Sequence, residues 1–126
     1  MRTDIRDTLI SIARKKTLIT YEQLNVALNL GLNFDYPSDR DLIGNWLGEI
    51  SEFEVLEKRH MLSALVVHKK DKGFGEPGEG FYKYAIELGV YDRRNDEAFW
   101  FSEVTWLHNY WSSHPIDPGV NTRIHD

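Results

Sequence analysis

Apolar residues recur at helical spacing through the first part of the chain. Between Thr3 and Lys15 they fall at every third or fourth position, and Asp4 lies near the start, where the helix dipole favours an acid. Thr20 is a favourable N-cap for a second helix, because its hydroxyl can accept from a free backbone N–H. The pattern therefore predicts two short amphipathic helices before Gly31, the second carrying Tyr21, Leu24, Ala27 and Leu28.

A third helix is predicted after a turn of Gly, Asn, Asp and Pro residues between Gly31 and Pro37. Ser38 is the expected cap of this helix. Its apolar face is continuous and consists of Leu42, Ile43, Trp46, Leu47, Ile50 and Phe53. The rest of its surface is expected to be acidic and exposed, and carries Glu49, Glu52, Glu54 and Glu57.

The segment after this helix changes from apolar to glycine-rich. Residues 60–68 contain a short run of branched apolar side chains flanked by charge, which predicts a largely buried strand. Residues 69–80 hold four glycines and a proline. This composition predicts a tight loop or the tip of a hairpin.

Two further helices are predicted in the last third of the chain. The first covers Phe81 to Gly89, and the second covers about Glu97 to Ser113. The apolar side of the second consists of Phe99, Trp100, Val104, Leu107, Tyr110 and Trp111. We expect residues 1–114 to form a single globular domain and residues 115–126 a C-terminal tail. The fold class predicted is α+β, mainly α, with four or five helices around a small β-sheet or hairpin.

Three segments, in order, resemble the winged-helix domain of alkyltransferase-like DNA-binding proteins. They are Thr20 to Leu24, Ile43 to Leu47 and Val66 to Gly73, so the resemblance covers residues 18–73. It implies a helix-turn-helix followed by a glycine-rich wing, in a nucleic-acid-binding or regulatory protein. The phosphate contacts of such a wing would be Lys69, Lys70 and Lys72. Alternatively, these lysines form only a solvated hairpin tip.

The chain departs from that family at the reactive position. Where the alkyl-accepting members carry a proline-cysteine-histidine-arginine motif before paired valines, this chain has Leu62, Ser63, Ala64 and Leu65. Alkyl transfer is therefore excluded. The arginine that the family places before the glycine of its third helix is matched only loosely by Arg40, which lies one position off, so base flipping is not inferred.

Composition narrows the possible chemistry further. The 126 residues include no cysteine, which excludes a disulfide scaffold, a thiol nucleophile, an iron–sulfur cluster and a zinc site built on thiolates. Fifteen Lys and Arg against 20 Asp and Glu give a net charge of -5, which opposes loose binding to a phosphate backbone. The sequence lacks a cleavable signal and an apolar run of about 20 residues, so we expect a cytoplasmic protein without a membrane partner.

Recognisable catalytic motifs are missing from the sequence. The five histidines show no metal-ligand spacing, and Ser63 has no Gly-x-Ser-x-Gly motif around it. On a strand, Ser63 would also face away from His60 and His68. We therefore expect no metal, no cofactor and no catalytic residue, and we predict that the protein is not an enzyme.

Residues 81–111 are unusually rich in aromatic residues. They contain more aromatic side chains than the buried face of one helix can hold. Phe101 and Trp106 fall off the predicted core stripe, so they must meet another element, a partner or solvent. Together with Glu49 and Glu52, they are the predicted partner-binding residues. An acidic and aromatic surface suits a basic protein partner, as an antitoxin, immunity protein or inhibitor of a nucleic-acid enzyme requires. Nucleic-acid binding by a winged helix is the alternative.

Overall fold

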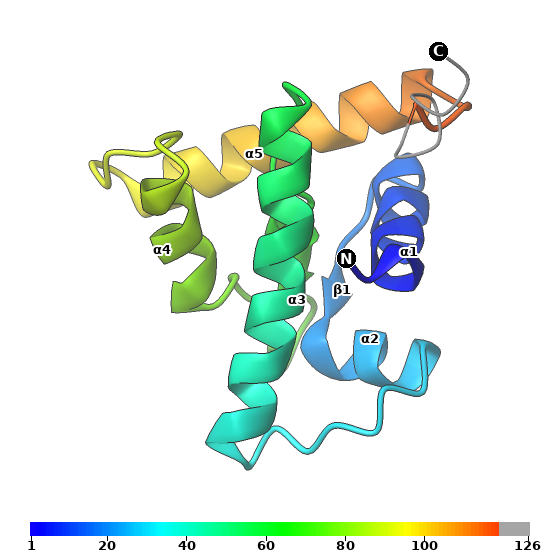
Figure 1. The fold of residues 1–126 in the computed structure, drawn as a ribbon, viewed down its shortest axis with the longest axis vertical. Helices are drawn as coiled ribbons and strands as arrows, with labels where there is room; N and C mark the ends of the chain where they lie inside the picture. The colour runs from blue at the N-terminus through cyan, green and yellow to red at the C-terminus, as the bar shows by residue number, and fades with distance from the viewer. Residues whose placement is uncertain (119–126) are drawn as a thin grey trace.

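A computed structural model describes residues 1–118 of the chain (Figure 1). Within that range the chain forms five α-helices, a short 3-10 helix and two short strands. The helices are α1 (Thr3–Arg14), α2 (Tyr21–Ala27), α3 (Pro37–Leu56), α4 (Glu79–Glu87) and α5 (Asp96–Ser113). The strands are β1 (Ile19–Thr20) and β2 (Val66–Val67), and the 3-10 helix is η1 (Leu62–Leu65). The prediction of a mainly α, α+β fold is confirmed.

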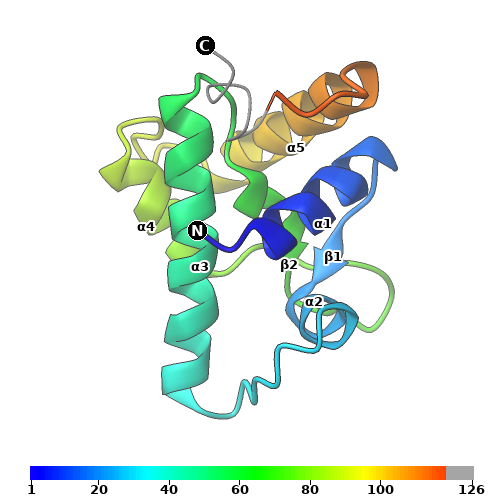
Figure 2. The ribbon, with the colours of Figure 1, turned by 45° about the vertical axis from the view of Figure 1, so that its right-hand side comes forward.

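The long helix α3 runs through the middle of the molecule. Figures 1 and 2 show α1 on one side of it and α4 on the other, with α5 crossing near its C-terminal end. η1 packs against α1, α3 and α5. Its residues Leu62, Ala64 and Leu65 have no exposed surface. The hydrophobic core is therefore organised around η1, and buried residues of α4 (Phe81, Tyr82 and Ala85) belong to the same core.

The strand expected over residues 60–68 is mostly wrong. Only Val66 and Val67 form a strand there, and they pair in parallel with Ile19 and Thr20 of β1. The residues before them form η1 instead, with buried side chains throughout. A short apolar run that is buried on every side lacks the periodicity of either a strand or a helix, so the sequence pattern could not distinguish the two.

Polar side chains and a proline define where three helices begin. Thr20 and Gln23 form a capping box at α2, in which each side chain accepts from the other residue's backbone N–H, at 3.1 and 3.0 Å. Asn95 caps α5 through its side-chain oxygen. The expected cap of α3 is wrong, because the helix begins at Pro37 and Ser38 lies within its first turn. Proline is favoured at this position since it has no N–H to leave unpaired.

One glutamate of α3 is buried, not solvated. Glu54 has no exposed surface and accepts hydrogen bonds from Arg6 and Arg59 at distances of 2.9 to 3.1 Å. Arg6 is 2% exposed and also binds Asp117, with 2.7 Å between Nη1 and Oδ2. The expectation that Glu54 belongs to the exposed acidic surface is therefore wrong. Its burial is tolerated because two guanidinium groups offset its charge and satisfy its oxygens.

The beginning of the predicted C-terminal tail contacts the domain. Besides the Arg6–Asp117 pair, Arg14 donates to the backbone carbonyls of Trp111 and His114 at the end of α5. The basic end of α1 therefore supplies side-chain donors to carbonyls at the C-terminal end of α5. The rest of the predicted tail, residues 119–126, lies outside the described residues.

Candidate functional site

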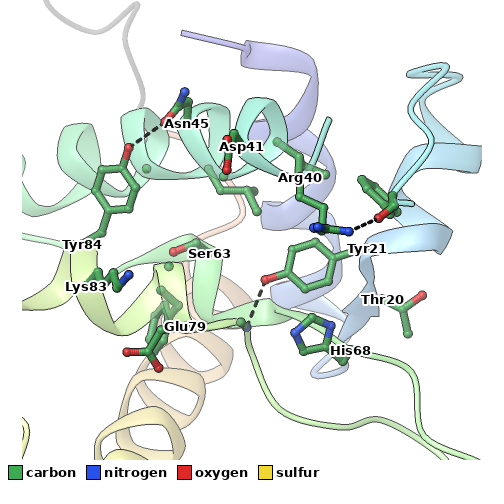
Figure 3. A pocket seen from close by; sticks show the side chains of 18 of the residues that line it. Thr20, Tyr21, Arg40, Asp41, Asn45, Ser63, His68, Glu79, Lys83 and Tyr84 are labelled. Carbon is green, nitrogen blue, oxygen red and sulfur yellow. Dashed lines mark hydrogen bonds between the residues drawn. The ribbon is translucent and has the colours of Figure 1, made fainter. Parts of the chain in front are cut away.

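A cleft of about 940 Å³ lies between α3 and the segment that joins β2 to α4 (Figure 3). Pockets for small ligands typically measure about 300 to 1,000 Å³. The apolar lining includes Phe34, Ile43, Leu47 and Phe81, and the polar lining includes Tyr21, Asp41, Asn45, His68 and Lys83. These residues come from separate segments of the chain, so no local sequence motif marks the cleft.

Tyr84 of α4 lines the cleft and is held against α3. A Cβ added at Gly48 would lie 2.1 Å from Tyr84 Cζ, so the ring fits only because position 48 has no side chain. The Tyr84 hydroxyl donates to Asn45 Oδ1 at 3.3 Å (Figure 3). The bare backbone of α3 and the Asn45 amide therefore fix where this ring lies.

Gly44 lies one helical turn before Gly48, on the same side of α3. It also lines the cleft. A Cβ added at Gly44 would meet no atom within 4 Å. One glycine of α3 is thus covered by an aromatic ring, whereas the other leaves the helix backbone open to the cleft.

Three carboxylates act on the Tyr84 hydroxyl from outside the cleft. Partial burial, followed by the negative charges of Glu87, Glu49 and Glu52, raises the pKa of Tyr84. All three glutamates are exposed. The Glu49 side chain keeps 58% of its surface exposed, although its carboxylate lies 3.7 Å from the Met1 amino group. We call Tyr84 together with these three glutamates the acidic face.

The other end of the cleft is built on Tyr21, at the start of α2. Its hydroxyl accepts a hydrogen bond from the Gly78 backbone N–H at 3.1 Å, and its ring centre lies 5.0 Å from that of His68. Burial raises the pKa of Tyr21, and the Gly78 N–H acts in the opposite direction. Because the Thr20 cap fixes the start of α2, this end of the cleft is preformed.

Ser63 also lines the cleft, but its hydroxyl is engaged within the core. The residue is 6% exposed, and its Oγ lies 2.7 Å from Ser51 Oγ. Ser63 belongs to η1, so the strand geometry expected to separate it from the neighbouring histidines does not apply. Within residues 1–118, the hydrogen-bond partner of this hydroxyl is Ser51 and not a histidine.

The four residues predicted to bind a partner fall into two pairs. Glu49 and Glu52 lie together in the acidic face. Phe101 and Trp106 belong to α5, where the Phe101 side chain is 70% exposed. The structure gives no hydrogen bond, ion pair or ring contact within residues 1–118 that joins one pair to the other.

Trp106 is covered by other rings on both faces. It stacks nearly parallel with His60, at 4.2 Å between ring centres, and with Tyr110, at 4.6 Å. Tyr110 in turn stacks on His114 at 3.9 Å. His60 also forms a hydrogen bond with the buried Glu103. Trp106 therefore meets another element, one of the three outcomes expected for it, and presents only its edge outward.

Sequence reasoning missed Tyr84 and the cleft. The sequence pattern does not single out Tyr84, which packs in part against the core. The informative feature was Gly48, a glycine in the interior of a predicted helix, which costs about 1 kcal/mol relative to alanine. Such a glycine often marks the close approach of another group.

The lysine-bearing loop folds back on itself, as the hairpin prediction requires. Lys69 forms an isolated antiparallel bridge with Phe74, and the Lys70 N–H donates to the Gly73 carbonyl at 3.3 Å. Lys69 and Lys70 are exposed, as is Lys72. Lys69 also lines the cleft.

The connection between α2 and α3 differs from a standard helix-turn-helix. That motif joins its helices by a turn of about three to four residues, whereas here residues 28–36 separate them. Arg40, the loose match to the family's arginine, donates to the Phe34 carbonyl at 2.7 Å. The winged-helix resemblance therefore stays a prediction from sequence.

Within residues 1–118, no group of three His, Asp or Glu side chains is arranged to hold a metal ion, and His125 lies outside that range. The helices described here are all too short or too polar to cross a membrane. Comparison of the chain with protein-family models, curated proteins and solved structures finds no match.

Proposed function

We propose that this protein is a non-catalytic binding protein whose acidic face binds a basic protein. The observation that carries the proposal is a group of exposed carboxylates around the place where Tyr84 packs on α3. Glu49 and Glu52 lie one turn apart on α3, and Glu87 lies one turn after Tyr84 on α4. Antitoxins, immunity proteins and inhibitors of nucleic-acid enzymes require such a surface, because their targets present basic residues that normally contact phosphates.

The chemistry of the acidic face suits arginine and lysine side chains. Carboxylates accept hydrogen bonds from guanidinium and ammonium groups, and the face of a tyrosine ring attracts a cation. Tyr84 is held in place by Gly48 and Asn45, so little side-chain entropy is lost when a partner binds. The net charge of -5 would also speed the approach of a basic partner.

The remaining parts of the proposal follow from the sequence. A cytoplasmic location, the absence of a cofactor and the absence of catalysis all fit a protein that acts by occupying the surface of another protein. Phe101 is then a second contact on α5, available to a partner large enough to reach it.

The proposal is tested with a fluorescein-labelled hexa-arginine peptide, whose binding is followed by anisotropy at two salt concentrations. We expect saturable binding that weakens as salt rises and weakens at least fivefold in the Glu49→Gln/Glu52→Gln variant. The control is Asp7→Asn/Glu97→Gln, which removes the same charge from exposed positions on α1 and α5. Equal losses in the two variants, or no binding, would refute the acidic face as the site.

Nucleic-acid binding is the second candidate, and the closed loop bearing Lys69, Lys70 and Lys72 favours it. Its expected result is tight duplex binding at low salt that is lost when the three lysines become glutamine. We expect only weak duplex binding, because the protein carries a net charge of -5. Anisotropy with labelled duplex and single-stranded DNA distinguishes the two functions.

A further inference from the structure

Two glycines of α3 present the same surface to the cleft, but only one is covered. At Gly48 the ring of Tyr84 lies directly on the helix backbone. Gly44, one turn earlier on the same side, has nothing within 4 Å of where its Cβ would be. The packing of the described residues therefore explains the glycine at position 48 and does not explain the one at position 44.

Glycine is a poor choice for the interior of a helix unless something must come close to the backbone. Gly44 lies well inside α3 (Pro37–Leu56). Its φ is not in the left-handed region, so no turn or strained conformation requires glycine there. A group that approaches the helix from outside the described residues would account for a glycine at this position.

The surroundings of Gly44 fit an aromatic ring. The half-buried ring of Tyr84 lies one helical turn away, over Gly48, and the half-buried ring of Phe34 lines the same cleft. Lys83 of α4 also lines the cleft and lies beside Tyr84 (Figure 3). A ring seated over Gly44 would bury apolar surface against these side chains and could receive a cation–π contact from Lys83.

We infer that the basic partner inserts one aromatic side chain into the cleft over Gly44, beside the acidic face. This inference rests on the proposed function, because charge complementarity with the acidic face determines what kind of partner arrives. Aromatic anchors in pockets commonly dominate protein interfaces, and charged contacts at the rim then fix the register. The structure already shows this arrangement within the chain, where Tyr84 covers Gly48.

Two labelled peptides test the inference: one of six arginines with a central tryptophan, and one of six arginines with a central alanine. On the unmodified protein, the tryptophan peptide should bind at least tenfold more tightly than the alanine peptide. In the Gly44→Leu variant this advantage should disappear, because the leucine side chain occupies the space over α3. The affinity of the alanine peptide should stay the same.

Two control variants separate this inference from the proposed function. Glu49→Gln/Glu52→Gln should weaken both peptides by the same factor and preserve the tryptophan advantage. Ala98→Leu adds a leucine to an exposed position of α5 and should change neither affinity. Gly44→Ala adds only a methyl group to open space, so it should fold normally and reduce the tryptophan advantage in part.

The outcomes are distinguishable. Equal affinity of the two peptides for the unmodified protein, or a tryptophan advantage that survives Gly44→Leu, would overturn the aromatic anchor and leave the acidic face intact. A tryptophan advantage that survives would place the ring elsewhere, for example over Tyr84. If neither peptide binds, both the proposed function and the anchor are wrong.

Discussion

The ring of Tyr84 lies on the backbone of Gly48, so that a single methyl group at position 48 would overlap it. Gly48→Ala should therefore displace Tyr84 and lower the free energy of unfolding by about 1 to 3 kcal/mol, although alanine is the better helix former. Denaturant melts measure this loss. The same variant should bind the hexa-arginine peptide more weakly, because the ring at the centre of the acidic face has moved.

Gly44→Ala should have the opposite effect on stability. Its methyl group enters open space, so the helix gains about 0.5 to 1 kcal/mol from the loss of glycine flexibility. Denaturant melts of Gly44→Ala and Gly48→Ala under identical conditions test whether the two changes in the free energy of unfolding have opposite signs. A Gly44→Ala variant less stable than the unmodified protein would mean that position 44 is already tightly packed.

Glu54→Gln should be strongly destabilising. The change leaves Arg6 and Arg59 beside a neutral group in a buried position, and breaking a buried ion pair costs about 3 to 5 kcal/mol. Chemical unfolding measures the loss. Glu52→Gln, on the exposed side of the same helix, is the matched control and should change stability by no more than about 0.5 kcal/mol. Similar values for the two variants would contradict the burial of Glu54.

Two tryptophans of α5 should respond differently to truncation. Trp100 packs against the core and donates from Nε1 to the Ala64 carbonyl at 2.9 Å, so Trp100→Ala should cost about 3 to 5 kcal/mol. Trp106 also packs in part against the core, and it stacks on two rings, each contact worth about 0.5 to 1.5 kcal/mol. Trp106→Ala should cost less, because the hydrogen bond to Ala64 is made by Trp100. Equal losses in denaturant melts would place Trp106 in the core.

Alkaline pH should destabilise the protein through Tyr82. Burial, and then the negative charges of Asp96 and Glu76, raises the pKa of Tyr82 to about 12. An unfolded chain has a tyrosine pKa of about 10, so the folded state retains this proton more tightly between about pH 10 and 12. The stabilisation is complete below about pH 10 and is lost as the pH rises through about 12. Tyr82→Phe has no such proton, so its denaturant midpoint should fall less steeply than that of the unmodified protein between about pH 10 and 12. An equally steep fall in both proteins would contradict a raised pKa for Tyr82.

The helices could be predicted from the sequence because each carries apolar residues at helical spacing, and two of them also begin at a side-chain cap. Thr20, for example, is an N-cap by both pattern and geometry. Residues 62–65 could not be assigned, since a fully buried apolar run has no periodicity. The exposed position predicted for Glu54 is wrong, although glutamate is usually exposed. Its helical spacing from Ile43, Leu47 and Ile50 places position 54 on the buried side of α3.

The candidate site was predictable only in part. Glu49 and Glu52 were identified because exposed acids on an amphipathic helix are visible in the pattern. Their association with Tyr84 depends on how α4 packs on α3, which is a tertiary contact between distant segments. Gly48 indicated a close approach without showing which side chain makes it.

The contacts of α1 have a consequence for when the chain can fold during synthesis. Arg6 and Asp117 are 111 positions apart, and Arg14 reaches the His114 carbonyl across 100 positions. Helix α1 is therefore translated long before its partners in α5 and in the residues that follow α5. Such long sequence separation slows folding, and the part of α1 that packs on α5 stays uncovered until α5 is made, although α1 also packs on η1. A nascent chain halted before α5 should consequently bind chaperones and resist compaction, whereas release of residues 96–118 should allow the core to close in one step.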